Sequence, residues 1–137
     1  MFIETALVCM ALNTYHEARG ETVMGRHAVA QVTMNRAERD PKNVCKVVTA
    51  KKQFSWTNKA FGLVKVVNGR FVLTEKGLPT DADAWSAALK IAKVTLNGQM
   101  SDFTRGADHY HTKKVDPPWN KNMTVLAIYG THRFFRA

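Results

Sequence analysis

The sequence lacks long apolar runs, and none approaches the ~20 residues that a helix needs to span a bilayer. Its first segment, residues 1–11, contains Glu4 and has no basic region of the kind that opens a signal peptide. Internal repeats, linkers and low-complexity segments are also absent. We therefore expect one globular domain over residues 1–137, made in the cytoplasm without a signal peptide and with no stable membrane association.

Cysteine is scarce as well. Cys9 and Cys45 both lie in apolar surroundings, without the Cys-x-x-Cys spacing of redox and zinc motifs. A chain of 137 residues is long enough to bury a hydrophobic core without covalent cross-links. We expect two buried free thiols, which behave as small apolar side chains, although the spacing does not exclude a disulfide.

Acidic residues are few: the chain has 11 of them and 20 lysines and arginines, which gives a net charge of +9. This excess favours a polyanionic partner, whether nucleic acid, an anionic membrane or the anionic polymers of a bacterial wall. The basic residues are scattered rather than grouped, and the sequence contains no recognisable nucleic-acid-binding motif. We therefore expect no nucleic-acid partner, and a basic nucleic-acid-binding module remains the non-enzyme alternative.

Apolar periodicity and turn signals predict an α+β fold that is mostly helical and carries a β-hairpin lobe. The predicted helices span residues 4–16, 21–38, 41–50 and 80–97. Asn68-Gly69 separates two β-rich runs and predicts the hairpin, because both central residues of a type I′ turn need positive φ. We expect residues 51–60 and 101–121 to be irregular, and residues 124–135 to form a strand or a hairpin around Gly130.

Three polar residues are expected to shape the helix ends. Asp40 precedes Pro41 and should cap the third helix, while Thr80 should cap the fourth. Glu21 should be the first-turn acid of the second helix, where it would interact favourably with the helix dipole.

Glu17, at the end of the first predicted helix, is the leading candidate for chemistry. Desolvation of a carboxyl beside aromatic residues raises its pKa and keeps a proton available near neutral pH. Cleavage of a glycosidic bond needs such a proton on the leaving oxygen. Spacing alone equally fits a solvated glutamate paired with a nearby cation such as Arg19.

Two further groups could contribute to a site. In an extended segment His109 and His111 point the same way, and together with His132 they could form a zinc site or simply line a cleft. The stretch Gln53-Phe54-Ser55-Trp56 mixes an aromatic ring with amide and hydroxyl groups, as a sugar-binding subsite does, although a loop folded onto the core has the same composition. Trp119 has the same ambiguity.

Several blocks of this chain resemble the SleB-like cell wall hydrolases, a family that includes spore-cortex-lytic enzymes and phage endolysins. The resemblance spans nearly the whole chain in the expected order, except for residues 61–80. The blocks are Tyr15-His16-Glu17-Ala18-Arg19-Gly20-Glu21, Gly25-x-x-Ala28-Val29-Ala30-x-Val32, Asn35-Arg36, Val44-Cys45-x-Val47-Val48, Gln53-Phe54-Ser55-Trp56, Gly106-Ala107-x-His109-Tyr110-His111, Pro118-Trp119 and Gly130-x-His132-x-Phe134-Phe135-Arg136.

The resemblance implies a small lysozyme-like fold that cuts the glycan strand of bacterial peptidoglycan, with Glu17 as the general acid. It further implies a lytic transglycosylase, in which one glutamate serves as acid and then as base and closes a 1,6-anhydro ring on N-acetylmuramic acid. A hydrolytic muramidase would need a second carboxylate, for which Asp108 is the best candidate. We expect Tyr110 to orient Glu17 or the substrate.

The remaining expectations concern binding and setting. We expect Gln53, Ser55, Trp56, Asp108, His109 and His111 to contact the substrate. No metal or cofactor is expected, and a zinc-dependent peptidoglycan amidase using the three histidines is an alternative. A monomeric endolysin, made in the host cytoplasm and released to the wall by a separate protein, fits these expectations, and its charge would help it hold an anionic wall.

Overall fold

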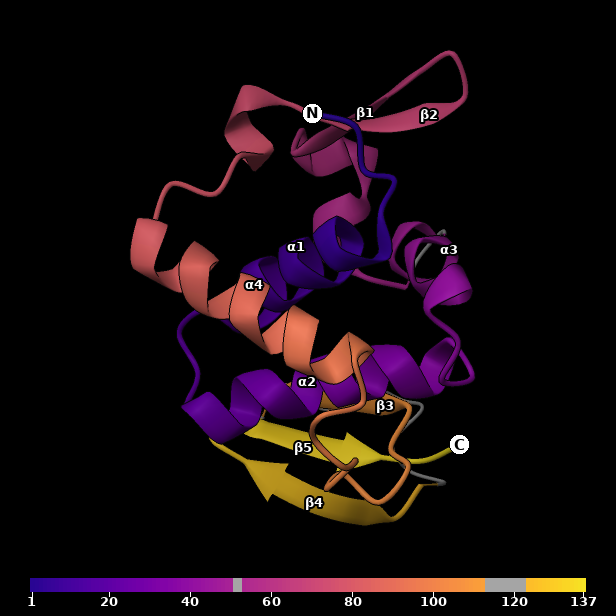
Figure 1. Ribbon diagram of the computed structural model, residues 1–137, viewed down its shortest axis with the longest axis vertical. Coiled ribbons are helices and arrows are strands. Elements are labelled where there is room, and N and C mark those ends of the chain that lie inside the picture. Colours follow the sequence, from indigo (N-terminus) through magenta and orange to yellow (C-terminus); the bar gives the residue numbers. More distant parts are fainter. Residues whose placement is uncertain (51–52, 113–122) are drawn as a thin grey trace.

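The computed structural model describes residues 1–50, 53–112 and 123–137. In these residues four α-helices lie between a β-hairpin at one end of the molecule and a three-stranded sheet at the other (Figure 1). The helices are α1 (Ala6–Ala18), α2 (Val23–Arg36), α3 (Val44–Thr49) and α4 (Ala82–Leu96). This architecture is the expected mostly helical α+β fold.

Helix α1 is the central element. Its residues from Cys9 to Tyr15 are all buried, and α2, α3 and α4 pack around it. The Thr5 hydroxyl accepts a hydrogen bond from the backbone N–H of Val8 and caps the start of α1. The C-terminal turn of α1, which carries Glu17, therefore extends from a rigid helix surrounded by core.

The prediction of two free thiols is wrong, because Cys9 and Cys45 form a disulfide. Helix α3 packs across α1 and brings the two Cα atoms to 5.2 Å, within the range that a disulfide needs. The two residues are 36 positions apart, and only the packing of the two helices reveals that they meet.

Two expected helix-end roles also need correction. Asp81, not Thr80, caps α4, because its carboxylate accepts from the backbone N–H of Ala84 at 3.0 Å. Glu21 precedes α2, which is capped by Thr22, and its carboxylate instead accepts from the backbone N–H and the hydroxyl of Thr131, both at 2.8 Å. Asp40 caps the 3₁₀ turn Pro41–Asn43 ahead of α3, as predicted.

The hairpin is confirmed. Strand β1 (Val64–Val67) pairs with β2 (Arg70–Leu73), and φ is positive at both Asn68 and Gly69. The preceding segment, expected to be irregular, contains two short 3₁₀ turns, Ser55–Thr57 and Lys59–Phe61. The lobe is anchored to α1 by a hydrogen bond of 3.0 Å between His16 Nε2 and the carbonyl oxygen of Gly77.

The three-stranded sheet packs on α2 (Figure 1). Its order is β3 (His109–Thr112), β5 (His132–Phe135) and β4 (Val125–Tyr129), all antiparallel neighbours. The β4–β5 hairpin around Gly130 is confirmed, whereas the expectation of irregular structure misses β3. Strand β3 forms because it pairs with β5, which is distant in sequence. A local sequence pattern does not reveal such pairing.

No helix in the described part of the chain is both long and apolar enough to cross a membrane.

Candidate active site

Glu17 lies in the last turn of α1 and faces strand β3 of the sheet. The phenol hydroxyl of Tyr110 donates a hydrogen bond to Glu17 Oε1 at 2.9 Å. The two residues are 93 positions apart, so the contact depends on the sheet lying against the helical core. Glu17 as a whole residue is half-buried.

Burial raises the pKa of Glu17 above its ordinary value of 4.5, while the hydrogen bond from Tyr110 and the positive charge of Arg36 act in the opposite direction. The desolvation effect is the largest of the three and determines the direction of the shift. A carboxyl group with this balance holds its proton to a higher pH than a solvated glutamate does. It can therefore donate a proton and, once ionised, is stabilised by one donor and one nearby cation.

Tyr110 is held by aromatic neighbours. Its ring meets His132 edge-on at 5.2 Å between centroids and lies 5.7 Å from the ring of Phe134. Burial and the adjacent Glu17 raise the pKa of Tyr110 well above 10.0, so the phenol keeps its proton and remains a hydrogen-bond donor.

Arg36, the last residue of α2, acts on the charge of Glu17 and contacts the residue just before β3. Its Nε donates to the carbonyl oxygen of Asp108 at 2.5 Å, and its guanidinium lies over the Phe54 ring at 4.8 Å from the centroid. Burial lowers the pKa of Arg36, and the carboxylates of Asp108 and Glu17 partly offset this effect. Among the described residues its Nη1 is a buried atom without a hydrogen-bond partner.

A second carboxylate, Glu21, is linked to Tyr110 through His132. His132 Nδ1 is 3.3 Å from Glu21 Oε1, and the His132 ring also contacts the Tyr110 ring. Burial raises the pKa of Glu21, but the hydrogen bonds from Thr131 and the charge of His132 outweigh it and hold the pKa below its ordinary value. Glu21 therefore stays ionised and fixes the β4–β5 turn.

Sequence reasoning missed the parts that Arg36 and Glu21 play. Arg36 does occur in one of the blocks quoted above, but a helix-terminal arginine carries no local signal of the strand that it will contact.

The residues around Tyr110 have other partners. Asp108 Oδ1 lies 2.8 Å from His109 Nδ1 and accepts from the backbone N–H of Ala137 at 2.8 Å. His111 is buried, with Nδ1 2.7 Å from the carbonyl oxygen of Thr112 and its ring stacked on Phe135 at 4.9 Å. Within residues 1–50, 53–112 and 123–137, no group of three or more His, Cys, Asp or Glu side chains could hold a metal ion. The zinc alternative therefore has no ligand cluster there.

Trp56 belongs partly to the core. It is 4% exposed, its Nε1 donates to Asn13 Oδ1 at 2.8 Å, and its ring stacks on His16 at 4.8 Å between centroids. Ser55, next to it, is exposed. Trp119 lies outside the described residues.

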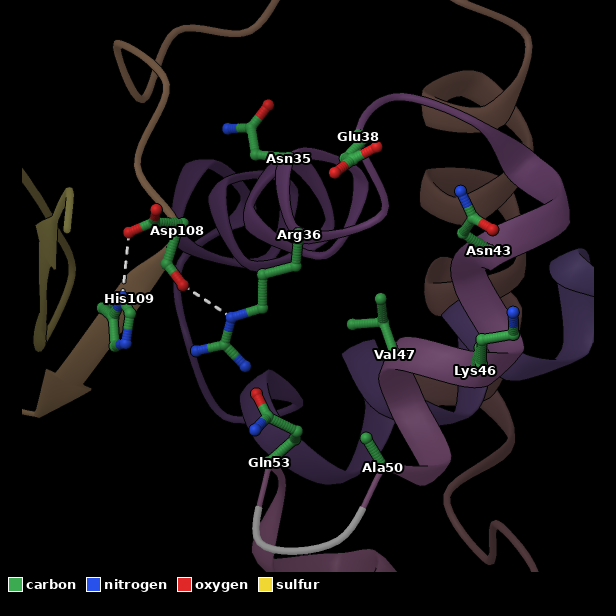
Figure 2. A pocket seen from close by; sticks show the side chains of 10 residues that line it. All are labelled: Asn35, Arg36, Glu38, Asn43, Lys46, Val47, Ala50, Gln53, Asp108 and His109. Atoms are coloured by element: carbon green, nitrogen blue, oxygen red, sulfur yellow. Dashed lines mark hydrogen bonds and ion pairs between the residues drawn. The ribbon is translucent and has the colours of Figure 1, made fainter.

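Two hollows lie near Glu17. The smaller, of about 360 Å³, has aromatic and apolar walls together with Ser55 and Lys76; its other lining residues are His16, Trp56, Phe61 and Leu63. The larger, of about 710 Å³, lies between the C-terminal end of α2, helix α3 and the start of β3 (Figure 2). It is lined by Asn35, Arg36, Glu38, Asn43, Lys46, Val47, Ala50, Gln53, Asp108 and His109.

Glu17 lines neither of these two hollows, but it adjoins both through a neighbour. His16 precedes it in the chain and lines the smaller hollow, and Arg36 acts electrostatically on it and lines the larger. The expected binding residues divide in the same way: Ser55 and Trp56 line the smaller hollow, whereas Gln53, Asp108 and His109 line the larger.

Comparison with protein families gives one match, to a model described as cell wall hydrolase, over residues 20–135. The matched segment includes Tyr110 and the residues of the larger hollow, and it begins just after Glu17. No curated protein sequence matched the chain.

Two solved structures share the fold. The catalytic domain of the Bacillus cereus SleB protein matches with a TM-score of 0.68 and 24% identity, covering 99% of this chain and 93% of that one. The catalytic domain of the germination-specific lytic transglycosylase SleB from Bacillus anthracis matches with a TM-score of 0.69 and 24% identity, covering 98% and 97%. Both matches confirm the lysozyme-like α+β fold expected from the sequence.

Proposed function

This chain belongs to the cell wall hydrolase family, and we propose that it cleaves the glycan strands of bacterial peptidoglycan with Glu17 as the general acid. The observation that carries the proposal is the carboxyl group of Glu17, which accepts a hydrogen bond from Tyr110 and whose pKa burial raises. An acid that keeps its proton at higher pH is what the departing sugar oxygen requires.

The proposed reaction is that of a lytic transglycosylase. Glu17 gives its proton to the oxygen that bridges N-acetylmuramic acid and N-acetylglucosamine, and the bond from that oxygen to the muramic acid C1 breaks. Positive charge develops at C1 and the ring oxygen. The ionised Glu17 then takes the proton of the 6-hydroxyl of the same muramic acid, whose oxygen bonds to C1 and closes the 1,6-anhydro ring. One carboxyl group thus completes both proton transfers, and no water is consumed.

The engagement of Asp108 and Glu21 supports this reaction over hydrolysis. A retaining or inverting hydrolase needs a second carboxylate facing the reacting carbon or its water. Asp108 Oδ1 is bound to His109 and to the backbone of Ala137, and Glu21 is bound to Thr131. The similar fold of a structure described as a lytic transglycosylase points the same way.

Tyr110 and Arg36 would assist Glu17 at different stages. Tyr110 fixes one carboxyl oxygen by its hydrogen bond, so the other oxygen is left to exchange protons with the substrate. Arg36 stabilises the carboxylate that remains after proton donation, because its charge favours the ionised form.

The expected binding residues would contact the strand on both sides of Glu17. We assign Ser55 and Trp56 to sugar binding in the smaller hollow, and Gln53, Asp108 and His109 to substrate binding in the larger. His111 is buried against Phe135, so we assign it an indirect role through the position of β3.

The product of digestion tests the proposal. Purified peptidoglycan is incubated with the enzyme after exhaustive chelation, and the released fragments are measured by mass spectrometry. We expect fragments with 1,6-anhydro ends, one water lighter than the reducing ends that a muramidase would release. Reducing ends would identify a hydrolytic muramidase on the same site, and loss of activity on chelation would support the zinc alternative.

We also propose that the protein acts as an endolysin, on a wall outside the cytoplasm. The net charge of +9 favours retention on anionic wall polymers, and the disulfide between Cys9 and Cys45 suits an oxidising compartment. To test this proposal, cells that express the protein alone are compared with cells that also express a membrane-permeabilising protein. Lysis should occur only when both proteins are present.

A further inference from the structure

The smaller hollow, lined by His16, and the larger hollow, lined by Arg36, differ in their chemistry. The smaller has the rings of Trp56 and Phe61 in its wall, and Phe61 is 53% exposed. Among the described residues that line the larger hollow, the imidazole of His109 is the one aromatic ring; Val47 is apolar, and the others include amide side chains and charges of both signs. Aromatic rings suit the faces of sugars, whereas unpaired charges do not suit neutral N-acetylated sugars.

The charges of the larger hollow fall into two groups. Arg36 and Asp108 are held by contacts within the protein: Arg36 by the Asp108 carbonyl and the Phe54 ring, Asp108 by His109 and the C-terminal backbone. Lys46 on α3 and Glu38 after α2 form no ion pair with any residue in the described part of the chain. These two groups remain available to a charged ligand.

Figure 2 shows how the hollow is arranged. Lys46 and Val47 lie on α3, across the hollow from Asp108 and His109, and Arg36 extends between them. Asp108 and His109 directly precede Tyr110, which donates to Glu17, so this side of the hollow lies close to the proposed acid along the chain. A volume of about 710 Å³ is in the range of sites that hold a ligand of several linked residues.

We propose that the larger hollow binds the peptide branch of the substrate, with Lys46 receiving a peptide carboxylate. This inference rests on the proposed function. In peptidoglycan the short peptide is attached to N-acetylmuramic acid, the sugar whose C1 is attacked, so the peptide must lie close to Glu17 during cleavage. In a peptide-bearing strand the carboxyl group of the muramic acid is tied up in the amide bond to the peptide, so the free carboxylates are those of the peptide, and amide side chains such as Gln53 match its backbone groups.

The consequence concerns which substrate the enzyme selects. An enzyme that binds the peptide branch prefers strands that still carry peptides over strands from which an amidase has removed them. Lys46 is exposed and outside the proton-transfer machinery, so its replacement should weaken binding of peptide-bearing strands while leaving cleavage of peptide-free strands unchanged.

The test compares kcat and KM on the two kinds of strand for the wild type, Lys46→Gln and a control, Lys42→Gln. Lys42 is an exposed lysine in the 3₁₀ turn just before α3 and does not line the hollow. Its replacement removes the same charge and so reports any general loss of attraction to the anionic wall. We expect Lys46→Gln to raise KM about tenfold on peptide-bearing strands, the value of one charge-assisted hydrogen bond, with no comparable change on peptide-free strands or in Lys42→Gln.

Equal losses on both kinds of strand, or no loss on either, would overturn the proposal. If the wild type cleaves neither strand, the proposed function fails, and the hollow is then tested directly. The isolated stem peptide is titrated into the isotope-labelled protein, and backbone amide shifts are followed by NMR. Shifts centred on residues 46–47 that disappear in Lys46→Gln would still support peptide binding, and their absence would reject it.

Discussion

Glu17, in the last turn of α1, and Glu21, in the connection between α1 and α2, are four positions apart, and their pKa values shift in opposite directions. Both carboxyl groups accept hydrogen bonds from the C-terminal sheet, Glu17 from Tyr110 on β3 and Glu21 from Thr131 in the β4–β5 turn. Burial raises the pKa of Glu17, whereas hydrogen bonds outweigh burial at Glu21 and lower its pKa.

The number of donors explains the difference. Glu17 has one neutral phenol donor, while Glu21 has a backbone N–H, a hydroxyl and a nearby imidazole. The site at Glu21 is also closely fitted: a Cβ at Gly130 would lie 2.6 Å from Glu21 Oε1. An under-solvated carboxyl group keeps a proton for chemistry, and a fully satisfied one joins two parts of the fold.

Of the substitutions that test this difference between the two glutamates, Glu17→Gln should have the largest effect on glycan cleavage. The amide keeps the size of the side chain and accepts from Tyr110, but it has no proton to donate. Loss of a general acid lowers the rate by about 10²–10⁴-fold, so we expect a folded protein with at least that loss in glycan cleavage. Fragment release is measured by chromatography and folding by circular dichroism.

The matched control for this change is Glu21→Gln, in which the same substitution is made at the carboxylate that we assign to structure. It should keep most of the cleavage activity under conditions where it is folded. If Glu21→Gln is the inactive variant and Glu17→Gln remains active, the two assignments are reversed.

Tyr110→Phe should have the next largest effect. It removes the hydrogen bond that lowers the pKa of Glu17 and leaves burial opposed only by Arg36, so the pKa of Glu17 should rise further. We expect cleavage to fall about tenfold, the value of one hydrogen bond to a charged group, and the alkaline limb of the rate profile to move to higher pH. Rates measured across a pH series provide both readouts.

Tyr129→Phe is the control for Tyr110→Phe. Tyr129 lies on β4 and its hydroxyl donates to the carbonyl oxygen of Phe103 at 3.0 Å rather than to Glu17. It should lower stability without moving the pH profile. A profile that is unchanged in Tyr110→Phe would remove Tyr110 from the proposed mechanism.

Glu21→Gln should affect stability more than activity. The folded-state pKa of Glu21 is lowered, so its contribution to stability is present above the unfolded-state pKa and is lost as pH falls through the folded-state pKa. We expect a loss of about 1–3 kcal/mol in unfolding free energy near neutral pH, the cost of disturbing hydrogen bonds to a charged acceptor. Urea unfolding at neutral and acidic pH should show the difference from the wild type narrowing in acid. A constant difference would mean that the charge of Glu21 is not the cause.

The sequence predicted the elements whose signals are local. The β1–β2 hairpin follows from Asn68-Gly69, and the cap on the third helical segment follows from Asp40-Pro41, because these residues act on their own backbone. Strand β3 and the Cys9–Cys45 disulfide were missed because both depend on segments that meet only after folding. The sequence is silent on such contacts.

The candidate site divides in the same way. Glu17 and Tyr110 could each be chosen from the sequence by their chemistry and by resemblance to a family, and Tyr110 was expected to orient Glu17 or the substrate. The hydrogen bond that joins them across 93 positions is seen only in the folded structure. Trp56 fitted a sugar subsite and a core position equally. The structure shows a ring that is 4% exposed and still borders the smaller hollow, and its part in sugar binding stays a prediction. Glu21 was misread because a glutamate ahead of a helix commonly serves the helix dipole, and its partner Thr131 is 110 positions away.

The smallest expected effect is on stability at Glu17 and has the opposite sign to that at Glu21. The folded-state pKa of Glu17 is raised, so the protonated side chain stabilises the fold below the unfolded-state pKa, and this contribution is lost as pH rises through the folded-state pKa. Above that pH the wild type holds a desolvated carboxylate, whereas Glu17→Gln holds a neutral amide. We expect Glu17→Gln to raise Tm by about 3 °C in mildly alkaline buffer and to leave it unchanged in acid. Thermal unfolding across a pH series measures both, with the exposed Glu75→Gln as a control that should show neither. A lower Tm for Glu17→Gln in alkaline buffer would show that Tyr110 and Arg36 fully compensate for burial, and the contrast between the two glutamates would then lie in accessibility to substrate rather than in proton affinity.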